Sequence, residues 1–125
     1  MSELAPRTDF ETAPAASGES TLVEQWAAIE DSARVVAMLA GRPAPRHDAI
    51  GEAQIGQLAQ VDGTRSNDAT QALAELVATM RAGLDALLGA HGTDADPHVA
   101  ARRLWTEYER GRAKVLSEVA IALAR

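Results

Sequence analysis

Apolar residues recur along this chain at alternating spacings of three and four, which is the repeat of an α-helix with one buried face. The pattern occurs in three long stretches, beginning near Thr21, Asp68 and Pro97, and more weakly over residues 48–61. We therefore expect an all-α fold, a small irregular antiparallel helical bundle of three long helices plus one short helix. The bundle domain should span residues 21–125.

The first helix should begin at Thr21, which can form a capping box with Glu24, and should end at Gly41. Glu30 falls on its polar side, where we expect an ordinary solvent-exposed pair with Arg34 four residues later. The predicted buried stripe of this helix consists of Leu22, Trp26, Ile29, Ala33, Val36 and Ala40.

A linker containing two prolines, residues 42–48, should be extended because proline disfavours a helical conformation in the residue before it. In the short helix that follows, over residues 48–61, Ile50 and Leu58 are predicted to share the buried face, with Ile55 at its edge. Two glycines weaken this helix, so we regard it as a second surface that a partner could change.

The next segment, residues 62–68, has the composition of a turn, and a long helix should run from Asp68 to Gly89. Its buried stripe consists of Leu73, Leu76, Val77, Met80, Leu84 and Leu87. The last helix should run from Pro97 to the end of the chain, with Asp96 as its N-cap.

The first 20 residues are rich in Pro, Ser, Thr, Glu and Ala, with Phe10 as their only aromatic residue. This composition predicts a disordered N-terminal tail, residues 1–20. No signal peptide is visible, and the longest apolar runs, 35–40 and 119–124, are far too short to span a membrane. Together with the absence of cysteine, this predicts a cytoplasmic protein.

The composition and the charge distribution indicate which classes of partner this chain can bind. Alanine supplies 27 residues of the 46% hydrophobic fraction, so the core should be thin, and a thin core favours association with a second subunit. The net charge is −6: residues 1–96 hold fifteen acids and six bases, and residues 97–125 hold three acids and six bases. An acidic body makes nucleic acid an improbable partner. The frequent Ala, Arg, Gly and Asp are typical of a GC-rich bacterial genome.

Residues 91–98, HGTDADPH, form the densest cluster of possible metal ligands: His91, Asp94, Asp96 and His98. Magnesium and calcium usually need more oxygen ligands, and zinc sites usually hold histidines at closer, helical spacings. The same residues have a complete structural interpretation, in which a glycine ends one helix and Asp96 and Pro97 begin the next. We therefore predict no metal and no cofactor.

No sequence feature indicates catalysis. The chain has no glycine-rich phosphate-binding motif, no H-E-x-x-H and no G-x-S-x-G. His47 lies in the proline linker, and no histidine lies mid-helix on an exposed face, as a phosphotransfer protein would need. We predict that the protein is not an enzyme and has no catalytic residues.

Arg112 is the one charge inside an apolar stripe, on the same face as Trp105 and Tyr108. Its stem could lie along the core with the guanidinium at the rim. Alternatively, it could form a buried ion pair, with Glu52, Asp62 or a partner's carboxylate as its mate.

An alternative function is a DNA-binding helix-turn-helix over residues 54–76. The expected recognition helix carries only Arg65 near its start to meet phosphate, which weakens this interpretation.

The sequence best supports a non-catalytic protein–protein interaction module, such as an adaptor, a chaperone-like protein or a regulatory subunit. Its partner would be another protein or a second copy, in a homodimer or a hetero-complex, with no membrane. Residues 119–124 have no polar side, so this end either frays as an alanine-rich helix end or docks on a second subunit or a partner. The predicted partner-binding residues are Ile55, Trp105, Tyr108, Arg112, Val119, Ile121 and Leu123.

Overall fold

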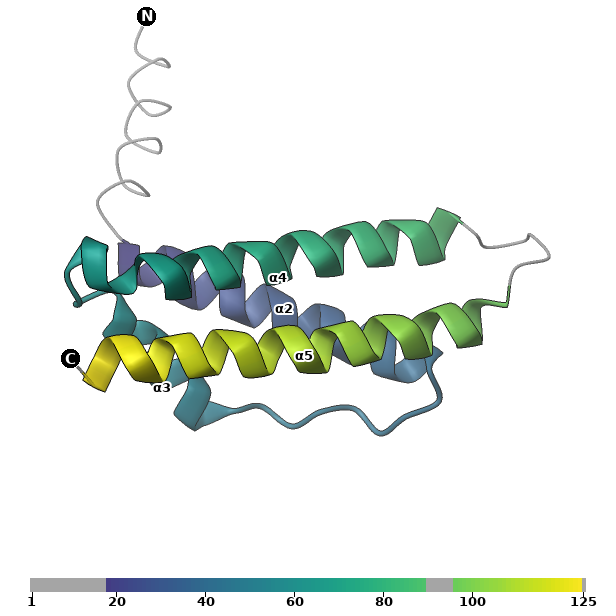
Figure 1. The fold of residues 1–125 in the computed structure, drawn as a ribbon. Coiled ribbons are helices and arrows are strands. Elements are labelled where there is room, and N and C mark those ends of the chain that lie inside the picture. Colours follow the sequence, from purple (N-terminus) through teal and green to yellow (C-terminus); the bar gives the residue numbers. More distant parts are fainter. Residues whose placement is uncertain (1–17, 90–95, 125) are drawn as a thin grey trace, which may run out of the picture.

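A computed structural model describes residues 18–89 and 96–124, with side chains from residue 22 onward. These residues form four helices and no strand: α2 (Gly18–Leu39), α3 (Ala49–Leu58), α4 (Gly63–Gly89) and α5 (Pro97–Ala124) (Figure 1). The prediction of an all-α bundle with three long helices and one short helix is confirmed. The predicted tail, residues 1–20, lies outside the described residues except for its last three, which are helical.

The linker sets the directions of the helices. Residues 42–48 are extended and run back along the bundle from the end of α2 to the start of α3 (Figure 1). As a result α2 and α4 run in the same direction, and α5 runs antiparallel to both. The prolines at 43 and 45 favour this extended path because they exclude helix from the residues before them.

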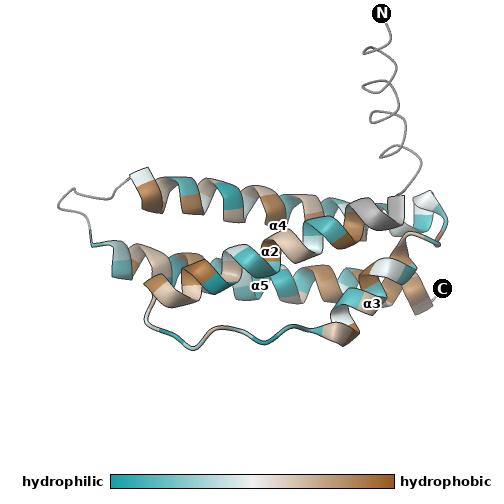
Figure 2. Cartoon of the chain, turned by 180° about the vertical axis from the view of Figure 1, so that it is seen from behind, coloured by the Kyte–Doolittle hydropathy of each residue, from teal (hydrophilic) through white to brown (hydrophobic). Residues whose placement is uncertain are grey.

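The predicted stripes of the three long helices form the core. Apolar and polar residues alternate around each long helix, as the brown and teal segments of Figure 2 show. Gly83 and Gly111 bring α4 and α5 close together, since a Cβ atom at either position would lie 2.5 Å from a leucine side chain of the other helix. The largest fully buried side chains are Trp26, Ile55, Leu58, Leu73, Met80, Val36, Val115 and Val119.

The end of α2 is confirmed, and its start is not. The helix begins at Gly18, three residues before the predicted cap. At its other end Gly41 has a φ of +72°. The amide of Gly41 donates to the carbonyl of Met38 at 3.2 Å, and the amide of Arg42 donates to that of Ala37 at 2.8 Å, which is a Schellman motif.

Replacing Gly41 with alanine should lower the free energy of unfolding by about 1–2 kcal/mol, because a side chain is strained at this φ. The new Cβ would also lie 2.9 Å from the imidazole Cε1 of His98. The matched control is Gly63→Ala, where a Cβ meets nothing within 4 Å; its effect should stay within about 0.5 kcal/mol. Urea denaturation measures both, and equal losses would contradict the prediction.

Two predictions about α3 and α4 were wrong. The segment predicted as a turn is the first part of α4, in which the carbonyl of Asp62 accepts from the amides of Arg65 (2.9 Å) and Ser66 (3.0 Å). In α3, Ile50 was expected to be buried but is 75% exposed, and Ile55 is central, not peripheral. The helix is rotated so that its two glycines face inward along with Ile55 and Leu58.

Candidate functional site

The seven predicted partner-binding residues do not form an open surface. The expectation that they stay exposed in the isolated chain is wrong for Ile55, Trp105, Tyr108 and Val119, which are buried in its core. Ile121 is 46% exposed, while Leu123 is half-buried against the core. The chain itself thus covers one side of the apolar end of the last helix, and Ala120, Ile121 and Ala124 are exposed.

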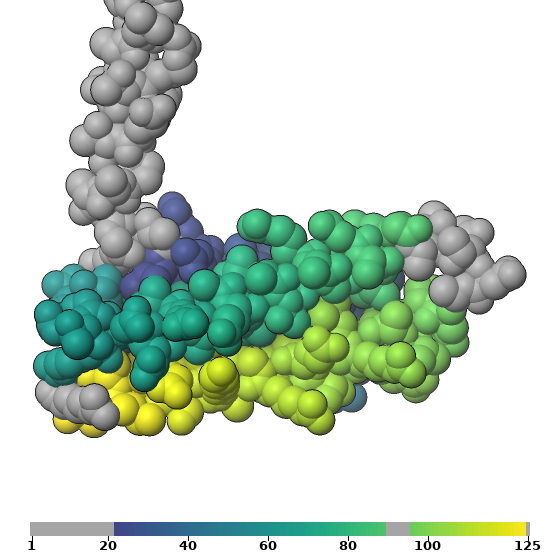
Figure 3. Space-filling view, turned by 45° about the horizontal axis from the view of Figure 1, so that its top comes forward, coloured from purple at the N-terminus to yellow at the C-terminus, as the bar shows by residue number. Residues whose placement is uncertain are grey.

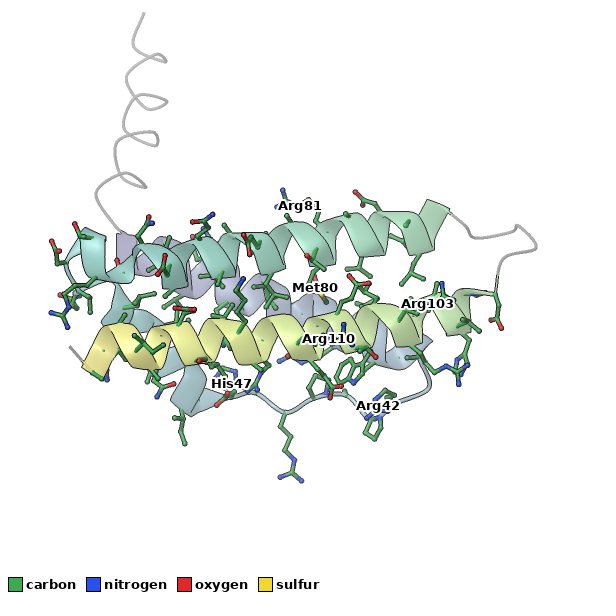
Figure 4. The ribbon with its side chains drawn as sticks, viewed as in Figure 1. Arg42, His47, Met80, Arg81, Arg103 and Arg110 are labelled. Atoms are coloured by element: carbon green, nitrogen blue, oxygen red, sulfur yellow. The ribbon has the colours of Figure 1, made fainter. Side chains whose placement is uncertain are left out.

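Two elements cover the side of α5 that carries Trp105. Helix α3 packs against α5, and the linker passes over it. The guanidinium of Arg42 lies 5.4 Å from the centre of the Trp105 ring, within range of a cation–π contact. Figure 4 labels Arg42 and His47, which lie near the two ends of this linker.

Arg112 pairs with Asp48, not with the predicted Glu52 or Asp62. Its Nη2 donates to the Asp48 carboxylate, and its guanidinium lies 6.0 Å from the centre of the Trp26 ring. The Arg112 side chain is 35% exposed, so its head lies at the rim of the core. Both predictions for Arg112 are therefore partly correct: its aliphatic stem lies along the core, and its guanidinium forms an ion pair.

Asp48 also organises the start of α3. Its carboxylate accepts from the amide of Gly51 at 2.9 Å, which makes it the N-cap. A side chain at Gly51 would collide with this cap, since a Cβ there would lie 2.6 Å from Asp48 Oδ2. One aspartate thus caps α3 and ties it to α5 through Arg112.

Glu30 is a buried carboxylate, and its predicted pairing with Arg34 was wrong. Only 8% of Glu30 is exposed, and it accepts from His47 Nδ1 at 3.1 Å and from the amide of Asp48 at 3.2 Å. Arg34 pairs instead with Asp31, at 2.6 Å. One sequence signal was missed: Glu30 follows Trp26 by four residues, so it lies beside the core and not opposite it.

His47 lies between two carboxylates. Its Nδ1 is 3.1 Å from Glu30 Oε1, and its Nε2 is 3.3 Å from Glu52 Oε1. The hydrogen bond to Glu30 and the charge of that carboxylate raise the pKa of His47 above its ordinary value of 6.5, and Glu52 adds to the same effect. The sequence had assigned no role to this residue.

A pocket of about 310 Å³ lies beneath the linker, between α2 and α5. Most of its charged groups bind one another or a neighbour: Asp48 binds Arg112, Glu30 binds His47, and Arg34 binds Asp31. The indole nitrogen of Trp105 is buried without a hydrogen-bond partner. Burial raises the pKa of the Tyr108 hydroxyl. The charged groups therefore join the linker to the bundle.

The metal-site candidates fall partly outside the described residues, which exclude His91 and Asp94. Asp96 accepts from the amide of His98 at 3.0 Å, so its predicted role as a cap is confirmed. His98 Nδ1 lies 3.1 Å from the carbonyl oxygen of Leu39. Within residues 18–89 and 96–124, no three His, Asp or Glu side chains are placed to hold a metal ion.

The residue expected to meet DNA phosphate has a structural contact. Arg65 Nη2 donates to the carbonyl of Ala122 at 3.0 Å, at the C-terminal end of α5. Carbonyls in the last turn of a helix lack partners within that helix, so this contact stabilises the helix end. DNA binding through residues 54–76 gains no support from this geometry.

Two grooves on the surface have largely apolar linings. The larger, about 530 Å³, lies between α4 and α5, which pack against each other in Figure 3, and its walls include Ala82, Ala86 and Ala100. The smaller, about 260 Å³, lies between α2 and α4 and is lined in part by Leu84 and Leu88. In Figure 4 the labelled Met80 and Arg81 mark its α4 wall.

The groove between α2 and α4 continues into exposed apolar side chains. Leu88 is 66% exposed. Val35 (38%) lies one turn beyond Ser32, which lines the groove. Met38 (71%) lies about 120° around α2 from Ser32 and is an isolated exposed side chain. We call Val35, Leu84 and Leu88 the α2–α4 patch.

No described helix is both long enough and apolar enough to cross a membrane. Comparison with protein-family models, with curated proteins and with solved structures finds no match to this chain.

Proposed function

We propose that this protein is a non-catalytic protein–protein interaction module and that its partner binds the α2–α4 patch. The observation that carries the proposal is the 66% exposure of Leu88 in the largely apolar groove between α2 and α4. Clustered apolar side chains on a surface mark interaction sites, whereas isolated ones are ordinary. Ile50 and Ile121 are such isolated cases.

The partner that we place first is a second copy of the chain. A single apolar patch can meet its own copy across a two-fold axis, which is the commonest arrangement in soluble oligomers. The alanine-rich composition supports this choice because small side chains bury little area within one chain. We further propose a cytoplasmic location, since the chain contains no cysteine.

The test compares Leu88→Asp with Ile50→Asp by light scattering over a range of concentrations. Ile50 is the matched control because it is 75% exposed but lies on α3, away from the patch. The wild type and Ile50→Asp should form dimers, and Leu88→Asp should dissociate at least about tenfold more readily. Circular dichroism should show that all three are folded.

Two other outcomes would distinguish a second copy of the chain from a foreign partner. A wild type that is monomeric at every concentration would exclude self-association. Affinity capture from the native cell would then compare the wild type with Leu88→Asp. A protein retained by the wild type and by Ile50→Asp, but lost with Leu88→Asp, would identify a foreign partner. Identical capture by all three would contradict the proposal.

A further inference from the structure

His47 can satisfy both of its neighbours only as a cation. A neutral imidazole has one N–H donor and one lone pair, whereas an imidazolium has two N–H donors. Both ring nitrogens face carboxylate oxygens, at 3.1 Å and 3.3 Å. In the neutral ring one lone pair would therefore point at a negatively charged oxygen. The geometry itself selects the protonated form.

The two carboxylates belong to different helices, so a protonated His47 links these helices by contacting both carboxylates. Glu30 is on α2 and is buried, while Glu52 is in the first turn of α3. His47 itself lies at the end of the linker. Its charge thus holds three parts of the chain together: the long helix, the linker and the short helix.

The element held in this way has little stability of its own. Helix α3 has only ten residues, two of which are glycine, and isolated helices of this length do not persist in water. It is kept in place by the burial of Ile55 and Leu58 and by the polar contacts at its start.

We propose that the imidazolium of His47 is a pH-dependent clasp, which fastens the linker and α3 to the bundle and loosens them when it loses its proton. This inference concerns the opposite side of α2 from the α2–α4 patch and does not depend on the proposed function. The opening would expose the surface beneath the linker, including Trp105 and Tyr108 of α5.

The charged and titratable groups around the clasp favour the cation. Glu30 faces His47 from α2 and Glu52 faces it from α3. From α5 come Tyr108, which is uncharged because burial raises its pKa, and Arg112, whose charge is paired with Asp48. Two close carboxylates therefore outweigh one cation whose charge is paired.

The sign of the pH dependence follows from the raised pKa of His47. A group with a higher pKa in the closed form binds its proton more tightly there. Its contribution is therefore complete below 6.5, the ordinary value, and is lost as the pH rises through the raised pKa. The clasp closes on the acidic side and opens on the alkaline side.

Hydrogen exchange of the α3 amides tests the proposal, with full-length wild type and His47→Gln compared from about pH 5.5 to about pH 9. Glutamine can still donate to Glu30 but cannot carry the charge. Intrinsic amide exchange depends on pH in the same way in both proteins. We therefore compare the ratio of their exchange rates at each pH. We expect α3 of the wild type to be several-fold better protected at low pH, with the ratio approaching one at high pH.

Two further variants complete the test. His98→Gln changes a histidine at the other end of the bundle, so the protection of α3 should match the wild type at every pH. Glu52→Gln removes one arm of the clasp and should flatten the pH dependence even if His47→Gln fails to fold. A ratio of one throughout for His47→Gln, or an unchanged pH profile in Glu52→Gln, would overturn the proposal.

Discussion

Replacing Trp26 with alanine is expected to lower the free energy of unfolding by about 3–5 kcal/mol, the largest effect of any single substitution that we foresee. Trp26 is 1% exposed and is the largest side chain that the fold buries fully. A domain of this size is stable by only about 5–15 kcal/mol, so the variant should lose a large share of its stability.

Phenylalanine at the same position separates volume from hydrogen bonding. The indole nitrogen of Trp26 is buried without a hydrogen-bond partner, and a buried donor without a partner is destabilising. Trp26→Phe keeps most of the apolar area and removes that donor, so its loss should be less than half that of Trp26→Ala. Urea denaturation followed by circular dichroism measures both. Equal losses of stability in the two variants would show that the cavity left by the indole ring is not the main cause of the loss.

Ending the chain at Glu118 should lower the free energy of unfolding by about 3–5 kcal/mol, from the area removed from the core. The deletion removes Val119 (0% exposed) and Ala122 (2%), together with the carbonyl to which Arg65 donates. Because these contacts lie within one chain, the loss should be the same at every protein concentration.

Single substitutions in the same helix turn provide the control. Val119→Ala should account for a large part of the loss, about 1.5–3 kcal/mol, while Ile121→Ala, at a position that is 46% exposed, should cost less than about 1 kcal/mol. If stability instead falls only on dilution, this end of α5 would be an interface between subunits. An unchanged unfolding transition in the truncated chain would show that residues 119–125 contribute neither to the core nor to an interface between subunits.

Helical periodicity accounts for most of what the sequence could predict about the fold. The stripes of the three long helices, the stop at Gly41 and the cap at Asp96 depend on residues within a few positions of each other. The start of α4 was misplaced because its first turn is rich in turn-forming residues. There, Arg65 is held by the distant end of α5, a contact that no local pattern contains.

The candidate sites depended on long-range geometry, which a single sequence does not display. An apolar stripe through Trp105 and Tyr108 looks the same whether α3 or a partner covers it. The pairing of Asp48 with Arg112, 64 residues later, depends on the path of the linker. Likewise, Leu88 lies next to its stripe, and only the packing of α2 beside α4 places it in a groove.

The returning linker has a consequence for the arrangement of any complex. Because it carries the chain back before α4 begins, the start of α2 and the end of α5 both lie at one pole of the bundle (Figure 1). The α2–α4 patch lies toward the opposite pole, where α2 and α4 end. Two copies joined there would hold the start of α2 and the end of α5 of each copy away from the contact. A tag placed after α5 would therefore leave the interface clear.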